Sequence, residues 1–211
     1  MLVQILVDNL GSWILPFAME LRDRLVREGN NALVIHDPKE VGKGDVLCLL
    51  GCEAIFKELH LNTHNLVVHE SGLPKGKGWS PLSWQVLHGE REIPVTLFEA
   101  DVKIDAGVIY GQEVIKLKGT ELVDELRAAQ GKATVNLIMN FISAYPNVKG
   151  VEQVGESTYY DKRTASDSRL DIDKSIREQF NLLRIVDNER YPAYFEFEGI
   201  KYKVSISKFK K

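Results

Sequence analysis

The sequence predicts an α/β protein with a mostly parallel β-sheet, followed by a small C-terminal extension made of a helix and a β-hairpin. Apolar runs at 2–7, 32–35 and 45–50 are typical of buried strands, and an amphipathic pattern between the first two predicts a helix. A strand, a helix and two further strands in this order indicate parallel pairing. Near the C-terminus, strand-like residues flank a Glu-Gly turn within 194–206, which predicts the hairpin.

Further elements are expected between these two regions. They are strands at 65–68, 95–100 and 108–115, a short helix at 81–87 and a long amphipathic helix over 121–145. Ser12 is expected to cap the first helix, Thr120 the long one, and Asp173 a helix in the extension. We therefore divide the chain into a main domain, 1–148, and a C-terminal extension, 149–211.

The composition is that of an ordinary globular protein, and it argues against some classes of function. Of 211 residues, 44% are hydrophobic and 27% charged, and the formal net charge is −3. A dedicated nucleic-acid binder usually carries a basic excess, so we expect no nucleic-acid partner. No signal peptide is visible and no run approaches the ~20 apolar residues of a membrane span, so we expect a cytoplasmic protein with no membrane partner. Cys48 and Cys52 are expected to be free thiols, and no metal site is expected.

Two common nucleotide-binding signatures are missing. The first strand is not followed by Gly-x-Gly-x-x-Gly, so a dinucleotide-dependent dehydrogenase is unsupported. A phosphate loop ending in Gly-Lys-Ser/Thr is absent as well.

A histidine stands where chemistry is expected in such a sheet. The run 65–68 delivers His69 at its carboxyl end, and the loop that follows holds glycines and prolines that give it a defined shape. Ligands of open α/β sheets bind outside the carboxyl ends of strands, and histidine is a common acid or base. Asp105 follows the strand 95–100, and a carboxylate that meets an imidazole fixes its tautomer and raises its basicity. From these residues alone, His69 could equally be an incidental histidine in a surface loop without a catalytic role.

A serine hydrolase is the first alternative, since Ser71 stands near His69. However, Gly-x-Ser-x-Gly is absent, and the two residues lie two apart on one chain segment. This alternative is therefore disfavoured.

Four short motifs occur in order from the histidine onward. They are His-x-Ser-x-Leu-Pro from His69, Gly-x-x-Pro from Gly78, Val-Thr-Leu from Val95 and Asp-x-Gly from Asp105. Together they resemble the formyltransferases that use 10-formyltetrahydrofolate, over about residues 35–115. The interval of 36 residues between His69 and Asp105 is also similar to that of the family. The resemblance implies a Rossmann-like formyltransferase fold, with 1–148 as the catalytic domain.

The resemblance also implies the chemistry of the site. The acceptor amine would attack the formyl carbon itself, while His69 acts as acid or base at the oxyanion. Asp105 would orient the imidazole and could take the amine proton through water. The family usually has asparagine two residues before the histidine, but this chain has Val67, which donates no hydrogen bond. Asn65 on the same strand face is the expected substitute and Asn9 an alternative, although either could be an ordinary structural asparagine.

Two groups of residues are implied to bind ligands. The formyl donor, 10-formyltetrahydrofolate, would contact Cys52, Ile55, Phe56, Asp101 and Ile104. The acceptor would contact Lys77, Gly78, Trp79, Pro81 and Tyr159. Ile55 and Phe56 could instead belong to the core, and Trp79 could pack the loop down. Lys162 and Arg163 could meet a phosphate-bearing acceptor or simply belong to a solvated crossing loop.

Within the family, this chain is most similar to the compact amino-sugar N-formyltransferases of the pseudaminic-acid type. That resemblance implies a small-molecule acceptor, a nucleotide-linked amino sugar such as a UDP-4-amino sugar of a nonulosonic acid pathway, in surface polysaccharide or glycan biosynthesis. The acidic net charge argues against tRNA as the acceptor. A formyltetrahydrofolate hydrolase and a non-catalytic folate-binding relative are the alternatives, and Val67 supports the second. The apolar C-terminal hairpin could pair two chains into a homodimer or cover the core.

Overall fold

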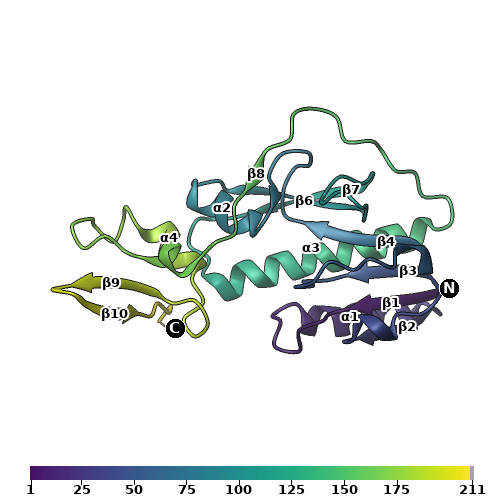
Figure 1. Cartoon of the computed structure of the whole chain (residues 1–211), viewed down its shortest axis with the longest axis horizontal. Helices are drawn as coiled ribbons and strands as arrows, with labels where there is room; N and C mark the ends of the chain where they lie inside the picture. The colour runs from purple at the N-terminus through teal and green to yellow at the C-terminus, as the bar shows by residue number, and fades with distance from the viewer. Residues whose placement is uncertain (210–211) are drawn as a thin grey trace.

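A six-stranded mixed sheet forms the centre of the computed structural model, which describes residues 1–209 (Figure 1). The strand order is β2-β1-β3-β4-β6-β7; the pairings from β2 to β4 are parallel and the last two are antiparallel. The strands are β1 (Leu2–Leu6), β2 (Asn31–Ile35), β3 (Gly44–Leu49), β4 (Asn62–His69), β6 (Glu92–Glu99) and β7 (Ile109–Lys116). The predicted mostly parallel α/β sheet is confirmed.

Two helices, α1 (Leu15–Arg27) and α3 (Val123–Ala144), pack together on one face of the sheet and bury its main core. Figure 1 shows α3 running along the sheet. A Cβ atom added at Gly131 of α3 would lie 2.4 Å from the ring of Phe17 in α1. The glycine, which is unfavourable inside a helix, therefore allows the two helices to approach closely.

The opposite face of the sheet is covered by returning segments with short 3₁₀ turns, Pro38–Glu40 and Leu59–Leu61. Here Leu6 and Leu47 of the sheet form a smaller core that Phe56 covers. This face is the one that carries Asn65, Val67 and His69, because Leu47 is the partner of Asn65 in the parallel register.

The carboxyl ends of β1, β3 and β4 lie at one edge of the sheet. The chain leaves β1 toward β2 on one side and later reaches β3 on the other side of β1, so the strand order reverses there. Ligands of open α/β sheets bind at such a point. The loop after His69 contains β5 (Lys77–Gly78), which pairs with β8 (Tyr159–Tyr160), and leads into α2 (Pro81–Leu87).

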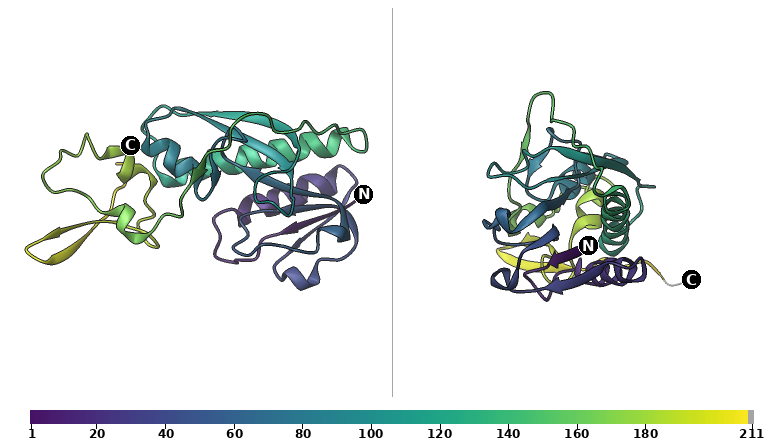
Figure 2. Two further views of the ribbon diagram at one scale, coloured as in Figure 1. Left: turned by 45° about the horizontal axis from the view of Figure 1, so that its top comes forward. Right: turned by 90° about the vertical axis from the view of Figure 1, so that its right-hand side faces the viewer.

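The C-terminal extension lies at one end of the molecule and holds α4 (Phe180–Ile185) and the hairpin of β9 (Ala193–Phe197) and β10 (Ile200–Val204). Figures 1 and 2 show the hairpin projecting away from the central sheet. Its inner side forms a small core with α4 around Leu183 and Ala193. The predicted hairpin is confirmed, whereas the division of the chain at residue 148 stays a prediction.

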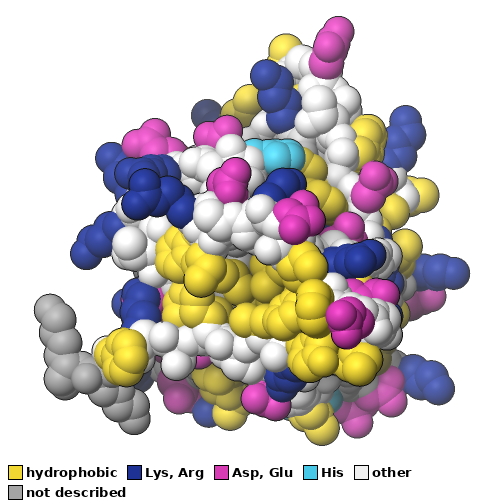
Figure 3. Space-filling model, turned by 90° about the vertical axis from the view of Figure 1, so that its left-hand side faces the viewer, with side chains coloured by type: hydrophobic (Ala, Val, Ile, Leu, Met, Phe, Trp, Pro, Cys, Tyr) yellow, Lys and Arg dark blue, Asp and Glu magenta, His cyan; other side chains and the backbone are white. Residues whose placement is uncertain are grey.

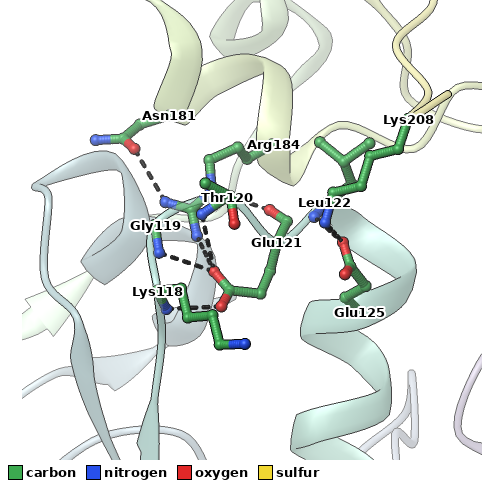
Figure 4. A network of polar contacts seen from close by, with 9 residues as sticks. All are labelled: Lys118, Gly119, Thr120, Glu121, Leu122, Glu125, Asn181, Arg184 and Lys208. Carbon is green, nitrogen blue, oxygen red and sulfur yellow. Dashed lines mark hydrogen bonds and ion pairs between the residues drawn. The ribbon is translucent and has the colours of Figure 1, made fainter. Parts of the chain in front are cut away.

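Arg184 fastens α4 to the segment that precedes α3 (Figure 4). Its side chain is 3% exposed and lies 3.0 Å from the carboxylate of Glu121. The guanidinium also donates to the Glu121 carbonyl at 2.9 Å and to Asn181 Oδ1 at 3.2 Å. The Glu121 carboxylate accepts the backbone N–H groups of residues 118–120 as well. This network ties the extension to the main domain.

The expected caps of the two long helices are wrong. Helix α1 begins after Ile14 without a side-chain cap, because Ser12 belongs to the preceding turn. Helix α3 begins after Leu122 rather than after Thr120. The Glu125 carboxylate accepts the Leu122 N–H at 2.9 Å and so satisfies the start of α3 from inside the helix.

The helix expected after Asp173 is also shorter than predicted. Residues 173–179 are mostly turns, and α4 occupies only Phe180–Ile185. The Gln179 side chain donates to the carbonyls of Asp171 and Lys174 and accepts the Asp171 N–H. These bonds close a loop where the apolar spacing indicated a helix. Elsewhere, the short helix over 81–87 is confirmed.

The structure offers no sign of a membrane segment or a metal site within residues 1–209. No helix there is long and apolar enough to cross a bilayer. No group of three or more potential metal ligands gathers in the same residues. Cys48 and Cys52 are free thiols.

Candidate active site

His69 is held firmly at the carboxyl end of β4. Its side chain is 9% exposed, and Nε2 lies 2.8 Å from the carbonyl oxygen of Gly76. A carbonyl oxygen only accepts hydrogen bonds, so Nε2 carries a proton and donates it to Gly76. In the neutral ring Nδ1 therefore keeps the lone pair, which makes Nδ1 the atom that can exchange a proton with a ligand.

Asp105 lies beside His69, as the sequence predicts. Its Oδ2 is 3.9 Å from His69 Nε2 and accepts the backbone N–H of Gly78 at 2.9 Å. Asp105 has a φ of 52°, and the Gln153 side chain donates to its carbonyl oxygen at 3.0 Å. A carboxylate at this place can stabilise positive charge on the imidazole during proton transfer.

On the strand face behind His69, the amide nitrogen of Asn65 is already engaged with the backbone. Val67 occupies the position two residues earlier. Asn65 is 4% exposed and its Nδ2 donates to the Leu59 carbonyl at 2.8 Å. That bond is structural, so the catalytic role expected of Asn65 stays a prediction without a contact to support it. Asn9 is likewise engaged, since its Nδ2 donates to Glu53 at 2.6 Å.

A cavity of about 380 Å³ opens at the edge of the sheet where these strands end. Asn9, Glu53 and Glu70 line it from just beyond β1, β3 and β4, and Arg127 and Gln130 line it from α3. The cavity thus lies at the reversal of strand order, next to the chain segment that carries His69. Its volume is within the range of about 300–1,000 Å³ that small-molecule sites usually have.

Aromatic and cationic side chains make up much of the cavity wall. The aromatic ones are Trp13, Trp79 and Tyr191, and the cations in addition to Arg127 are Lys162, Arg163 and Arg190. Lys162 Nζ lies 4.7 Å from the centre of the Trp79 ring, within cation–π range. Arg127 is neutralised by Asp187 at 2.9 Å.

Arg163 has a buried nitrogen that lacks a hydrogen-bond partner. Its Nε is buried and has no hydrogen-bond partner within residues 1–209, while its terminal nitrogen donates to the Asp167 carbonyl at 3.1 Å. Burial lowers the pKa of the Arg163 guanidinium from its usual high value. A buried donor without a partner is unfavourable, so an anionic ligand would be stabilised here.

The predicted acceptor residues fall into two groups. Trp79 lines the cavity with about half of its surface exposed. Lys77 and Gly78 form β5, Tyr159 is an exposed residue of β8, and Pro81 is buried at the start of α2. These four residues form the framework of the loop, and their role in binding an acceptor stays a prediction.

Several residues that line the cavity were not predicted from the sequence as site residues. Glu70 directly follows the histidine, and a charged residue at a strand end is a signal that could have found it. Arg127 and Gln130 lie one turn apart on the predicted long helix. The sequence does not show that this side of the helix faces the strand ends. Arg190 comes from the loop before β9, far away in sequence, and nothing local marks it.

Comparison with known proteins identifies the family. Residues 39–142, which contain His69 and Asp105, match the formyl transferase family. The methionyl-tRNA formyltransferase from Clostridium thermocellum has a similar structure, with a TM-score of 0.84 and 19% identity over 100% of this chain and 94% of that one. The sugar N-formyltransferase from Shewanella sp. FDAARGOS_354 gives a TM-score of 0.70 and 16% identity, over 100% of this chain and 99% of that chain. HypX from Aquifex aeolicus, in complex with tetrahydrofolic acid, gives a TM-score of 0.79 and 16% identity. That match covers 97% of this chain and 37% of the HypX chain.

Residues 39–142 therefore form a formyl transferase domain, and the chain is a formyl-transferring enzyme. At these identities the solved structures show that the fold is shared.

The formyl donor of this family is 10-formyltetrahydrofolate, and the residues around β4 fit it. The segment after β3 and the loop that carries Asp105 both lie along the β4 face. Each presents an exposed apolar side chain, Ile55 at 71% and Ile104 at 63%. On the β4 face itself, Asn65 Oδ1 is a buried acceptor without a partner among the described residues. Apolar walls with a free buried acceptor suit a flat heterocycle such as the pterin ring.

The other predicted donor-binding residues have different surroundings. Cys52 and Phe56 pack against the smaller core, and burial raises the pKa of the Cys52 thiol to about 12. Cys52 therefore stays protonated at neutral pH and acts as a packing residue rather than a nucleophile. Asp101 is exposed in the loop before Asp105. A contact of any of these residues with the donor stays a prediction.

Proposed function

We propose that this formyltransferase moves the formyl group of 10-formyltetrahydrofolate to the amine of a nucleotide-linked amino sugar. The observation that carries the proposal is the composition of the cavity beside the histidine loop. Aromatic faces such as that of Trp79 suit a nucleobase, while Lys162, Arg163 and Arg190 suit a diphosphate. The partnerless Nε of Arg163 supports an anionic ligand in particular.

The residues near the strand ends would perform the acyl transfer. The acceptor amine attacks the formyl carbon, and negative charge develops on the formyl oxygen. His69 exchanges a proton through Nδ1, while Asp105 stabilises the charged imidazole from 3.9 Å. The donor, when bound, supplies the formyl group. Neither Cys48, which is buried, nor the protonated Cys52 competes as a nucleophile.

The finer identity of the acceptor follows from the sequence resemblance. A UDP-linked 4-amino sugar of a nonulosonic acid pathway, used in surface polysaccharide or glycan biosynthesis, is the acceptor we propose. The shared fold with the Shewanella sugar N-formyltransferase is compatible with this choice. The net charge of −3 argues against tRNA, because nucleic-acid binding draws on a basic surface.

A panel of acceptors tests the proposal. The enzyme is supplied with 10-formyltetrahydrofolate and a UDP-linked 4-amino sugar, glycinamide ribonucleotide or methionyl-tRNA, and N-formyl products are measured by mass spectrometry. We expect the UDP-amino sugar to be formylated with the highest kcat/KM. Formylation of methionyl-tRNA alone would contradict the proposal. Formate release at the same rate with and without an amine would favour the alternative function of a formyltetrahydrofolate hydrolase.

We also propose that two copies of the chain pair through the C-terminal hairpin. The hairpin is a separate two-stranded sheet, and such a unit alone is only marginally stable. Apolar side chains gather on the end of the molecule where it lies (Figure 3). Phe197, Ile200 and Tyr202 contribute to this exposed apolar surface. An apolar surface of this kind is typical of a protein–protein interface.

A further inference from the structure

The cavity holds one carboxylate that the reaction, as described so far, does not use. Glu70 directly follows His69, and its side chain lines the cavity. Consecutive residues of an extended strand project to opposite sides of the sheet, so His69 and Glu70 diverge. Glu70 lines the cavity, whereas His69 does not. An acceptor that extends from the cavity around the carboxyl end of β4 would therefore contact both residues.

Several hydrogen bonds hold the main chain around Glu70. The Glu70 carbonyl accepts a hydrogen bond from Gln85 of α2 at 2.5 Å. The next carbonyl, that of Ser71, accepts the hydroxyl of Thr96 at 2.6 Å, and the Ser71 N–H donates to the His69 carbonyl at 2.9 Å. The backbone from which the Glu70 side chain projects is thus held in place, which helps to position a group that takes part in chemistry.

The other carboxylates near the cavity already have partners. Asp187 pairs with Arg127 at 2.9 Å, and Glu53 accepts the side-chain amide of Asn9 at 2.6 Å. Asp105 accepts the Gly78 N–H. Glu70, in contrast, forms no ion pair with any of residues 1–209; the neutral side chain of Gln130 is its neighbour on α3.

The surroundings of Glu70 favour uptake of a proton. Burial raises the pKa of its carboxyl group, and the nearby His69 and Gln130 offset part of this effect. A carboxylate without a fixed cation in a partly desolvated cavity attracts an ammonium group of a ligand. Once that ligand has given up a proton, the neutral carboxylic acid suits the same environment.

We propose that Glu70 binds the ammonium form of the acceptor amine and then takes its proton, which makes it a catalytic and specificity-determining residue for an amine rather than a hydroxyl acceptor. This inference rests on the proposed amine acceptor. Glu70 takes one proton of the ammonium group, which frees the nitrogen lone pair. The amine nitrogen then forms the new C–N bond with the formyl carbon and passes its second proton to Nδ1 of neutral His69. When the bond between the formyl carbon and the donor nitrogen breaks, its electron pair stays on that nitrogen, to which His69 gives the proton.

The test compares the wild-type enzyme with Glu70→Gln, using a UDP-linked 4-amino sugar and 10-formyltetrahydrofolate. Glutamine keeps the shape of the side chain and removes the proton acceptor. We expect kcat/KM for the amine to fall about 10²- to 10⁴-fold, with unchanged binding of the folate. Glu90→Gln, the same substitution at an exposed position outside the cavity, should leave kcat/KM unchanged.

The pH profile separates this role from a merely structural one. A base works only when ionised, so wild-type kcat/KM should decline as the pH falls through the raised pKa of Glu70. That acid limb should disappear in Glu70→Gln. Formylation of the amine at the wild-type rate and with the wild-type pH profile by Glu70→Gln would overturn the role of Glu70 alone. Release of formate by the wild type without any formylated amine would overturn both this role and the proposed function.

Discussion

At the scale of single residues, His69 and Asp105 form a pair that the chain brings together from two loops. The hydrogen bond from Nε2 to Gly76 fixes the imidazole, and Asp105 is fixed by Gly78. The glycine and proline content of the loop predicted a defined shape, and the structure shows its consequence. The loop folds back so that its own backbone orients both His69 and Asp105.

His69→Ala should abolish most turnover while the protein stays folded. Proton exchange at Nδ1 is lost, so kcat should fall about 10²- to 10⁴-fold. Formyl transfer and thermal unfolding are measured on the same preparations. His60→Ala, which removes an exposed imidazole outside the site, is the control. A loss of less than tenfold in His69→Ala would contradict the assignment.

Asp105→Asn should have a smaller effect. The amide oxygen can still accept the Gly78 N–H, so the loop keeps its geometry, but the negative charge beside the imidazole is gone. We expect kcat to fall about ten- to a hundredfold, with little change in KM. Steady-state kinetics with saturating donor measure both constants. An unchanged kcat would show that the carboxylate charge is not needed.

Sequence patterns identified His69 and Asp105 because each follows a strand and belongs to a motif. They could not identify Glu70, and they left Arg163 open between a phosphate contact and a solvated loop residue. The role of Glu70 depends on α3 passing in front of the strand ends, and that of Arg163 on a crossing segment that folds back across the cavity. Such contacts join parts of the chain that are far apart, and neither periodicity nor spacing encodes them.

At the scale of elements, the contact between α1 and α3 depends on Gly131. Gly131→Ala would place a methyl group against Phe17, which fills the space beside it. The higher helix propensity of alanine is worth about 1 kcal/mol, whereas overpacking costs about 1–3 kcal/mol. We therefore expect net destabilisation in chemical denaturation. Lys132→Ala, at the exposed neighbouring position, should change the free energy of unfolding little.

The extension should depend on Arg184 in the same way. Arg184→Ala leaves the carboxylate of Glu121 without its buried cation, and breaking a buried ion pair typically costs about 3–5 kcal/mol. Thermal and urea unfolding measure the loss. Arg177→Ala, at an exposed site in the same extension, is the matched control. Equal stability of the two variants would contradict the anchoring role of Arg184.

Element boundaries were less predictable than the elements themselves. The strands and the hairpin follow from apolar runs and a turn. The caps differ because local side-chain bonds compete: Glu125 satisfies the start of α3, and Gln179 closes a loop before α4. Neither bond can be told from the sequence, since each replaces one acceptable local arrangement by another.

At the scale of the whole molecule, the proposed pairing of hairpins makes a prediction about oligomeric state. Sedimentation should show a dimer of the full chain at micromolar concentration. Ile200→Lys places a charge within the exposed apolar surface and should shift the protein to a monomer. Lys132→Ala, on α3 and outside that surface, should leave the dimer intact. A wild-type monomer at these concentrations would rule out the pairing.

Across the whole molecule, we propose that the β4 face binds the folate donor while the cavity binds a nucleotide-linked acceptor. Calorimetric titration of the full chain with a non-reactive analogue of 10-formyltetrahydrofolate, with and without UDP, tests this claim most directly. We predict saturable binding of one analogue per chain and tighter binding when UDP is present. Absence of analogue binding in both conditions would contradict the account at its centre.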